Sequence, residues 1–109
     1  MIYNVKTIIV FERQAKRLVK KYSSLKSELL QLIQLLKETP QKQGISLGNN
    51  CYKIRIAIAS KGKGKSGGAR VITHLQISGS VVFLLSIYDK SEQADITDTE
   101  LTELLKFVK

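Results

Sequence analysis

The chain has 109 residues, 43% of them hydrophobic, and a formal net charge of +9. This length predicts one domain over residues 1–109, and the apolar content is too high for a disordered chain. Cys51 is the only cysteine and no run of about 18 apolar residues occurs, which excludes an internal disulfide and a transmembrane helix. We therefore expect a cytoplasmic protein without a membrane partner.

The charge is unevenly distributed along the chain. Residues 1–88 carry 15 of the 18 basic residues and only three acidic ones, whereas residues 89–109 carry six acidic and three basic residues. A basic body with an acidic end favours a polyanionic partner, such as nucleic acid or the ribosome. The alternative is that the charge serves solubility alone.

The chain up to Pro40 is predicted to form a strand and then two helices. Residues 2–10 are rich in Ile, Val and Tyr, which favours a strand. Apolar residues then recur at helical spacing in two stripes: Phe11, Ala15, Leu18, Val19 and Tyr22, and after them Leu25, Leu29, Ile33 and Leu36. Ser23 and Ser24 separate the stripes and Pro40 ends the second at about Thr39, so we expect a helix hairpin.

The rest of the chain is predicted as a loop, three strands and a last helix. Residues 41–50, QKQGISLGNN, contain two glycines and paired asparagines and are expected to be loop. CYKIRIAIA and ARVITHLQI alternate in the manner of half-buried strands, and VVFLLSIY is nearly all apolar, as a central strand is. Thr97 and Glu100 form a capping box ahead of an amphipathic helix.

These elements predict an α+β fold of order β-α-α-β-β-β-α. The last three strands are expected to pair antiparallel through two hairpins, and the helix pair to cover one face of the sheet. The opposite face is expected to stay partly open and to carry Lys53, Arg55 and Arg70, while the acidic last helix either packs over the basic body or is displaced by a partner.

Residues 60–70, SKGKGKSGGAR, contain two apparent nucleotide-binding motifs. The glycines fit G-x-G-x-x-G, and Gly64-Lys65-Ser66 resembles the end of a P-loop. Both motifs need a helix directly after the glycines, whereas a strand is predicted here, so we interpret the stretch as a glycine-rich hairpin tip. Its lysines are expected to bind RNA phosphates, the alternative being a merely solvated loop: Lys61, Lys63 and Lys65.

Four cations are expected to converge on one site. Lys53 and Arg55 share a face of one strand, Arg70 begins the next strand, and Lys90 follows the last. Around a phosphodiester they would stabilise the charge that gathers when a 2′-OH attacks the adjacent phosphorus, without a metal ion or other cofactor. The alternative is ordinary surface charge. The only histidine, His74, is interpreted as structural, with proton transfer as the alternative.

Several motifs carry a family resemblance that spans nearly the whole chain. CYKIR, ARVI and VVFLLSIYDKSE follow one another after a strand and a helix hairpin, and GKGKSGGARVI and IYDKSEQADIT add detail. In these motifs the sequence resembles the RelE/ParE superfamily of bacterial toxins, closest to its RelE/HigB branch. The resemblance implies a microbial RNase-type fold, a type II toxin–antitoxin toxin that cleaves mRNA on the ribosome, and a cognate antitoxin as partner.

The resemblance also implies roles for the four cations. By position, Lys53 and Arg55 match the family's basic pair, Arg70 the arginine that opens the next strand, and Lys90 the basic residue after the last strand. In that scheme the lysine or its neighbour is the general base, Arg70 stabilises the transition state and Lys90 assists the leaving oxygen. We favour Lys53 as base, because arginine stays protonated near neutral pH.

The sequence also departs from the RelE pattern. RelE toxins have arginine at the position of Lys90 and lysine at that of Arg55, and they lack the long Gly-Lys insert. Their late tyrosine, which stacks on a base, aligns with Ile96, so Tyr88 or Tyr52 is expected to provide the stacking surface. Two alternative functions stay open: a ParE-like, non-enzymatic inhibitor of DNA gyrase, and an inactive relative that only binds RNA or the ribosome.

Overall fold

A computed structural model describes residues 2–62 and 64–108 of the chain. The strands are β1 (Asn4–Thr7), β2 (Ile45–Gly48), β3 (Cys51–Ile56), β4 (Ala69–Gln76) and β5 (Val81–Asp89). The α-helices are α1 (Ile9–Lys21), α2 (Leu25–Glu38) and α3 (Asp98–Leu105). Three short 3-10 turns complete the elements: η1 (Pro40–Lys42), η2 (Ala59–Lys61) and η3 (Lys65–Gly67).

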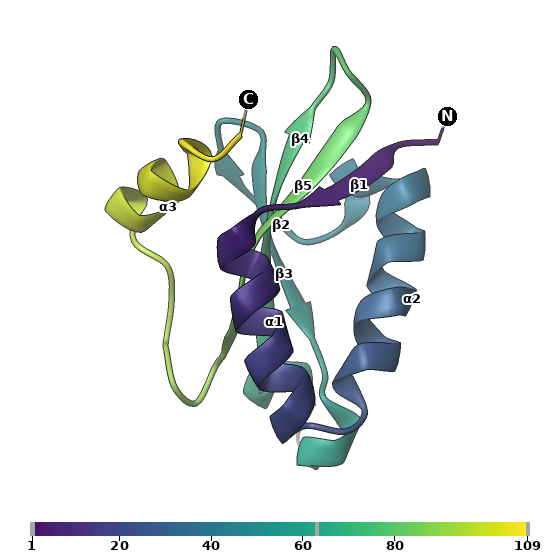
Figure 1. Cartoon of the computed structure of the whole chain (residues 1–109), viewed down its shortest axis with the longest axis vertical. Helices are drawn as coiled ribbons and strands as arrows, with labels where there is room; N and C mark the ends of the chain where they lie inside the picture. The colour runs from purple at the N-terminus through teal and green to yellow at the C-terminus, as the bar shows by residue number, and fades with distance from the viewer. Residues whose placement is uncertain (1, 63, 109) are drawn as a thin grey trace.

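The strands form one mixed sheet in the order β1-β5-β4-β3-β2 (Figure 1). β1 runs parallel to β5, and the other neighbours are antiparallel. The predicted α+β class, the helix hairpin and the antiparallel pairing of the last three predicted strands are therefore confirmed.

The expectation that residues 41–50 are loop was wrong, because they contain the end of η1 and the edge strand β2. Gly48 pairs with Cys51, so Asn49 and Asn50 form a two-residue hairpin turn, and both have positive φ (52° and 58°). This is the backbone of a type I′ turn, whose twist matches that of the flanking strands. Paired asparagines therefore marked a hairpin, and the element order is β-α-α-β-β-β-β-α.

The first strand is also shorter than predicted. It ends at Thr7, and α1 begins at Ile9, so Ile9 and Val10 belong to the helix. Both are apolar and β-branched, which made them look like a continuation of the strand. The second helix ends as expected, with Thr39 as its C-cap ahead of Pro40.

The helix hairpin packs its apolar stripes on one face of the sheet. Leu18, Leu25 and Leu36 are fully buried, and each contributes about 1.5–3 kcal/mol by leaving water. On the sheet, Ile54 and Val71 are paired across β3 and β4, and Ile54 lines a cavity together with Leu32 of α2. Because alternate residues of a strand point to opposite faces, Lys53 and Arg55 point away from the helices.

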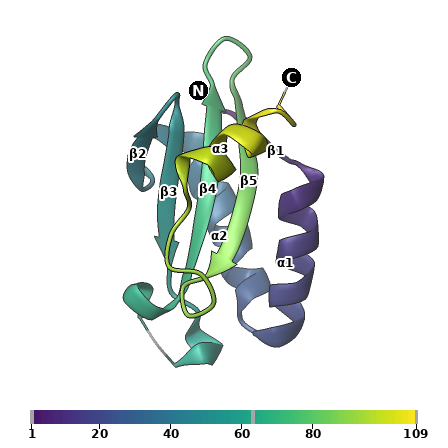
Figure 2. The same ribbon diagram turned by 90° about the vertical axis from the view of Figure 1, so that its left-hand side faces the viewer.

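The opposite face of the sheet is covered only in part, which agrees with the expectation of a partly open face, and the last helix packs over it (Figure 2). The segment after β5 crosses it and leads into α3, while α1 and α2 lie on the far side (Figure 2). The predicted capping box is present: Thr97 accepts from the Glu100 amide, and Glu100 accepts from the Thr97 amide. A capped helix at the end of a short segment thus covers part of the surface on which the predicted cations lie.

Candidate functional site

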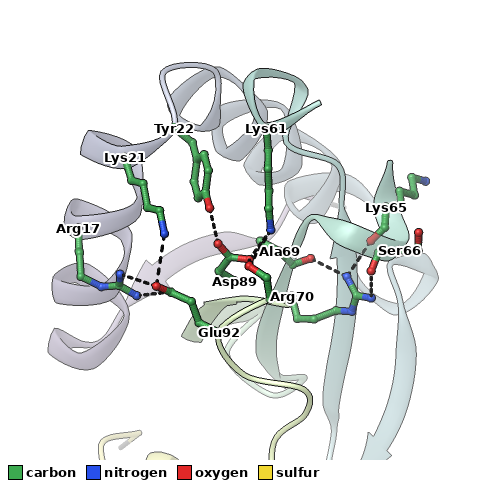
Figure 3. A network of polar contacts seen from close by, with 11 residues as sticks. Arg17, Lys21, Tyr22, Lys61, Lys65, Ser66, Ala69, Arg70, Asp89 and Glu92 are labelled. Atoms are coloured by element: carbon green, nitrogen blue, oxygen red, sulfur yellow. Dashed lines mark hydrogen bonds and ion pairs between the residues drawn. The ribbon is translucent and has the colours of Figure 1, made fainter. Parts of the chain in front are cut away.

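Arg70 holds the glycine-rich connection between β3 and β4. Its side chain is buried, with the residue 4% exposed, and its guanidinium donates to backbone carbonyl oxygens of Lys65 (2.8 Å), Ala69 (3.2 Å) and Ser66 (3.3 Å) (Figure 3). Hydrogen bonds from a charged donor are about twice as strong as neutral ones. The guanidinium therefore holds the loop that precedes β4 in place.

Gly68 allows this loop to lie close against β3. A Cβ at Gly68 would stand 2.1 Å from the carbonyl oxygen of Ile56, and the carbonyl of Gly68 accepts from the amide of Lys90 (3.0 Å). No side chain fits there, because the obstructing atom belongs to the backbone of β3. The glycine thus ties the end of the loop to β3 and to the end of β5.

We expect Gly68→Ala to destabilise the protein by about 1–3 kcal/mol, the usual cost of forcing an extra methyl group into a packed position. Urea denaturation followed by circular dichroism measures this. Gly64→Ala in the same loop is the matched control, since a Cβ there meets no atom within 4 Å. Equal stability of the two variants would contradict the close contact with β3.

Lys61 lies in a buried ion pair. Its ammonium contacts Asp89 Oδ1 and donates to Ser91 Oγ (3.0 Å), and Tyr22 donates to the other carboxylate oxygen (Figure 3). The Asp89 side chain is fully buried, and that of Lys61 is 11% exposed. Burial opposes ionisation of Asp89, but hydrogen bonds from Lys61, Tyr22 and Ser91 outweigh it and hold the pKa of Asp89 well below its usual range.

Arg55 and Lys53 line a cationic groove at the edge of β3, next to the start of β2. The groove has a volume of about 340 Å³. Its lining includes four basic residues and no acidic one: Lys42, Lys53, Arg55 and Lys65. Lys42, just before β2, was missed from the sequence because residues 41–50 were interpreted as plain loop.

The strand register places three predicted residues on one face of the sheet. Arg55 is paired with Arg70, and Arg70 with Tyr88. Residues directly opposite on antiparallel strands point to the same side. Tyr88 is buried, its hydroxyl has no hydrogen-bond partner in the described part of the chain, and burial, aided by the charge of Asp95, raises the pKa of Tyr88 to about 12.

Lys53 and Lys90 are joined through the segment that follows β5. Lys53 Nζ lies 3.0 Å from Asp95 Oδ1, and Lys90 donates to the carbonyl of Ala94 (2.9 Å). The Ile96 amide donates to Asp95 Oδ1 (2.8 Å). The Ile96 amide and then Lys53 hold the pKa of Asp95 below its usual range, so its carboxylate is charged at neutral pH.

The remaining sequence-predicted residues lie in different surroundings. Lys65 lines the groove, Lys61 is committed to Asp89, and Lys63 lies outside the described residues. His74 pairs in register with Cys51 and lies four positions along β4 from Arg70, its Nδ1 3.4 Å from Cys51 Sγ. Burial lowers the pKa of His74 and raises that of Cys51 to about 11.

A second basic surface lies on α1. Five exposed cations at helical spacing line a shallow groove of about 540 Å³: Arg13, Lys16, Arg17, Lys20 and Lys21. Glu92 lies beside it and pairs with Arg17 (2.9 Å) and Lys21 (3.4 Å). Helix α1 packs against β5, whereas β3, which lines the groove, lies toward the other edge of the sheet (Figure 2).

The fold and the site define a small, basic α+β protein with two cationic grooves, one on α1 and one along β3. None of the helices within the described ranges has the length and apolar character needed to cross a membrane. The family described as "RelE toxin of RelE / RelB toxin-antitoxin system" matches residues 7–109. The chain therefore belongs to the RelE toxin family, and the predicted family is confirmed.

Solved toxin structures share this fold. A doubly substituted Escherichia coli toxin RelE in the free state has a TM-score of 0.63 at 22% identity, covering 100% of both chains. The same mutant with an antitoxin RelBc peptide gives 0.54 at 21% identity, again over 100% of both chains. The Mycobacterium tuberculosis toxin–antitoxin complex RelBE2 gives 0.63 at 14% identity, covering 82% of this chain and 99% of the other.

Proposed function

We propose that this RelE-family toxin is an endoribonuclease that cleaves mRNA on the translating ribosome. The observation that carries the proposal is the cationic groove, in which Lys42, Lys53, Arg55 and Lys65 surround a space without an acidic residue. Such a groove attracts the phosphates of single-stranded RNA. The translating ribosome would place its action in the cytoplasm.

The proposed reaction is internal transfer at the RNA backbone. The 2′-oxygen attacks the adjacent phosphorus, the bond to the 5′-oxygen of the next nucleotide breaks, and a cyclic phosphate and a 5′-hydroxyl result. One group takes the proton of the 2′-OH and another supplies a proton to the leaving oxygen. Lys53 and Lys90 are the proposed proton-transfer residues, and Arg55 stabilises the negative charge of the transition state.

Arg70 and Tyr88 are assigned supporting roles at this site. The guanidinium of Arg70 is directed at carbonyl oxygens of the glycine-rich loop, so we assign it to positioning the loop that bears Lys65. Tyr88 lies next to Arg70 in the sheet and, once uncovered, would offer its ring and hydroxyl to the RNA. Lys61 is assigned to stability, because Asp89 already neutralises its charge.

The proposed partners are the ribosome and a cognate antitoxin. The α1 surface is rich in exposed cations and separate from the groove, which suits contact with ribosomal RNA while mRNA occupies the groove. The solved RelE and RelBE2 toxins are described with antitoxins. An antitoxin for this chain would be acidic where it meets either basic surface.

The test is cleavage of a defined mRNA by the purified chain, with and without ribosomes programmed on that mRNA. We expect new mRNA ends only when ribosomes are present. Equal cleavage of free mRNA would contradict ribosome dependence. Intact mRNA together with blocked gyrase supercoiling would favour a ParE-like inhibitor, and salt-dependent ribosome binding without cleavage would favour an inactive relative.

A further inference from the structure

The strap, which we define as residues 90–97, lies across the cations of the proposed site. It leaves the end of β5, crosses the face of the sheet and enters α3 (Figure 2). Within the strap, Lys90 donates to the Ala94 carbonyl, and the Asp95 carboxylate of the strap contacts Lys53 on β3. A negatively charged group and a carbonyl oxygen thus stand where RNA would place its oxygens.

The strap itself holds Asp95 in position. The Ile96 amide donates to Asp95 Oδ1 (2.8 Å), and the side-chain amide of Gln93 donates to the Asp95 carbonyl (3.0 Å). The Asp95 side chain is 63% exposed, whereas that of Lys53 is 22% exposed. The carboxylate therefore covers the lysine from the solvent side, as an incoming anion would.

Tyr88 is a second buried group that lies close to Asp95. The residue is 4% exposed, and its hydroxyl finds no hydrogen-bond partner among the residues described. Buried polar groups are nearly always hydrogen-bonded, so an unpaired one calls for an explanation. The hydroxyl is close enough to Asp95 for that carboxylate to affect its ionisation. A ligand oxygen that replaced the carboxylate would give it an acceptor.

We propose that Asp95 occupies a phosphate subsite formed by Lys53, Lys90 and Tyr88, and that it competes with the RNA backbone for this subsite. The inference rests on the proposed function only in taking a phosphodiester of single-stranded nucleic acid as the ligand. Before RNA binds, the Lys53–Asp95 pair opens and the strap shifts. A ligand moves such an equilibrium only as far as its affinities for the two states differ, so the strap lowers the apparent affinity of the free toxin.

The test is binding of a 2′-O-methyl RNA trinucleotide, which cannot be cleaved because its 2′-oxygens are blocked. NMR titration of the purified full chain in 150 mM salt, where charges more than about 8 Å apart are largely screened, gives the dissociation constant. We expect Asp95→Asn to bind about two- to five-fold more tightly than wild type, the factor expected for one exposed ion pair. Asp98→Asn, the same charge change three residues further on, should bind like wild type.

A double-mutant cycle makes the assignment specific. In a Lys53→Met background, Asp95→Asn should no longer tighten binding, because the pair it opens is already absent. Weaker binding by Asp95→Asn, equal tightening by both asparagine variants, or tightening that persists in Lys53→Met would each overturn the inference. So would wild-type protein that does not bind the trinucleotide. Because no ribosome or cleavage enters this assay, failure of the endoribonuclease proposal would be seen separately.

Discussion

Arg55→Ala is expected to lower ribosome-dependent mRNA cleavage by about 10²- to 10³-fold, the usual loss when one transition-state donor is removed. Arg55 is an exposed cation of the groove and is paired in register with Arg70. Its guanidinium can bind two phosphate oxygens at once in a fixed geometry. The measurement is the single-turnover rate of cleavage of mRNA on programmed ribosomes.

The size of the loss separates catalysis from simple binding. Arg55→Lys keeps the charge but not the bidentate geometry, so its rate should lie between those of wild type and Arg55→Ala. Lys26→Ala on α2 removes one exposed positive charge elsewhere and should cleave like wild type. Both alanine variants should keep wild-type stability to within about 0.5 kcal/mol, because surface substitutions cost little. Full cleavage activity of the Arg55→Ala protein would show that Arg55 takes no part in the reaction.

Asp89→Asn is expected to destabilise the protein by about 3–5 kcal/mol, because it removes one partner of a buried ion pair. Asp89 is fully buried and is the shared acceptor of Lys61, Tyr22 and Ser91. The substitution leaves the Lys61 ammonium with little water and no opposite charge. Urea denaturation at neutral pH gives the change in the free energy of unfolding.

The matched control for this prediction is Glu92→Gln. Glu92 makes two ion pairs, with Arg17 and Lys21, but all three side chains are well exposed, so its loss should cost no more than about 1 kcal/mol. If the two variants were equally stable, the buried ion pair of Asp89 would contribute no more to stability than the exposed ion pairs of Glu92.

Asp89 also determines how stability depends on pH. The pKa of Asp89 is lower in the folded protein than in the unfolded chain, where it is about 4. Its contribution is therefore fully present above about pH 4 and is lost progressively as the pH falls toward the folded-state value. The Asp89→Asn variant should lose less stability than wild type over this acid range.

Most of the secondary structure could be predicted, because it depends on neighbouring residues. The apolar stripes, the capping box of Thr97 and Glu100, and the alternation around Ile54 are local patterns whose partners lie a few positions apart. Alternation also predicted that Lys53 and Arg55 share a face. Strand β2 was missed because the Asn49-Asn50 pair is recognisable as a hairpin turn only once β2 is seen to pair with β3.

The sequence by itself determined the family, the helix hairpin, the three central strands and the set of cations on one face, because these follow from residue order and periodicity. Only the tertiary structure decided what each cation contacts. Lys61 meets Asp89, Lys53 meets Asp95 and Arg70 meets the carbonyl oxygens of its own loop. The first two pairs join residues 28 and 42 positions apart. Charges so far apart in the chain become neighbours only when the strands pair and the strap folds back over the sheet, so no local pattern records them.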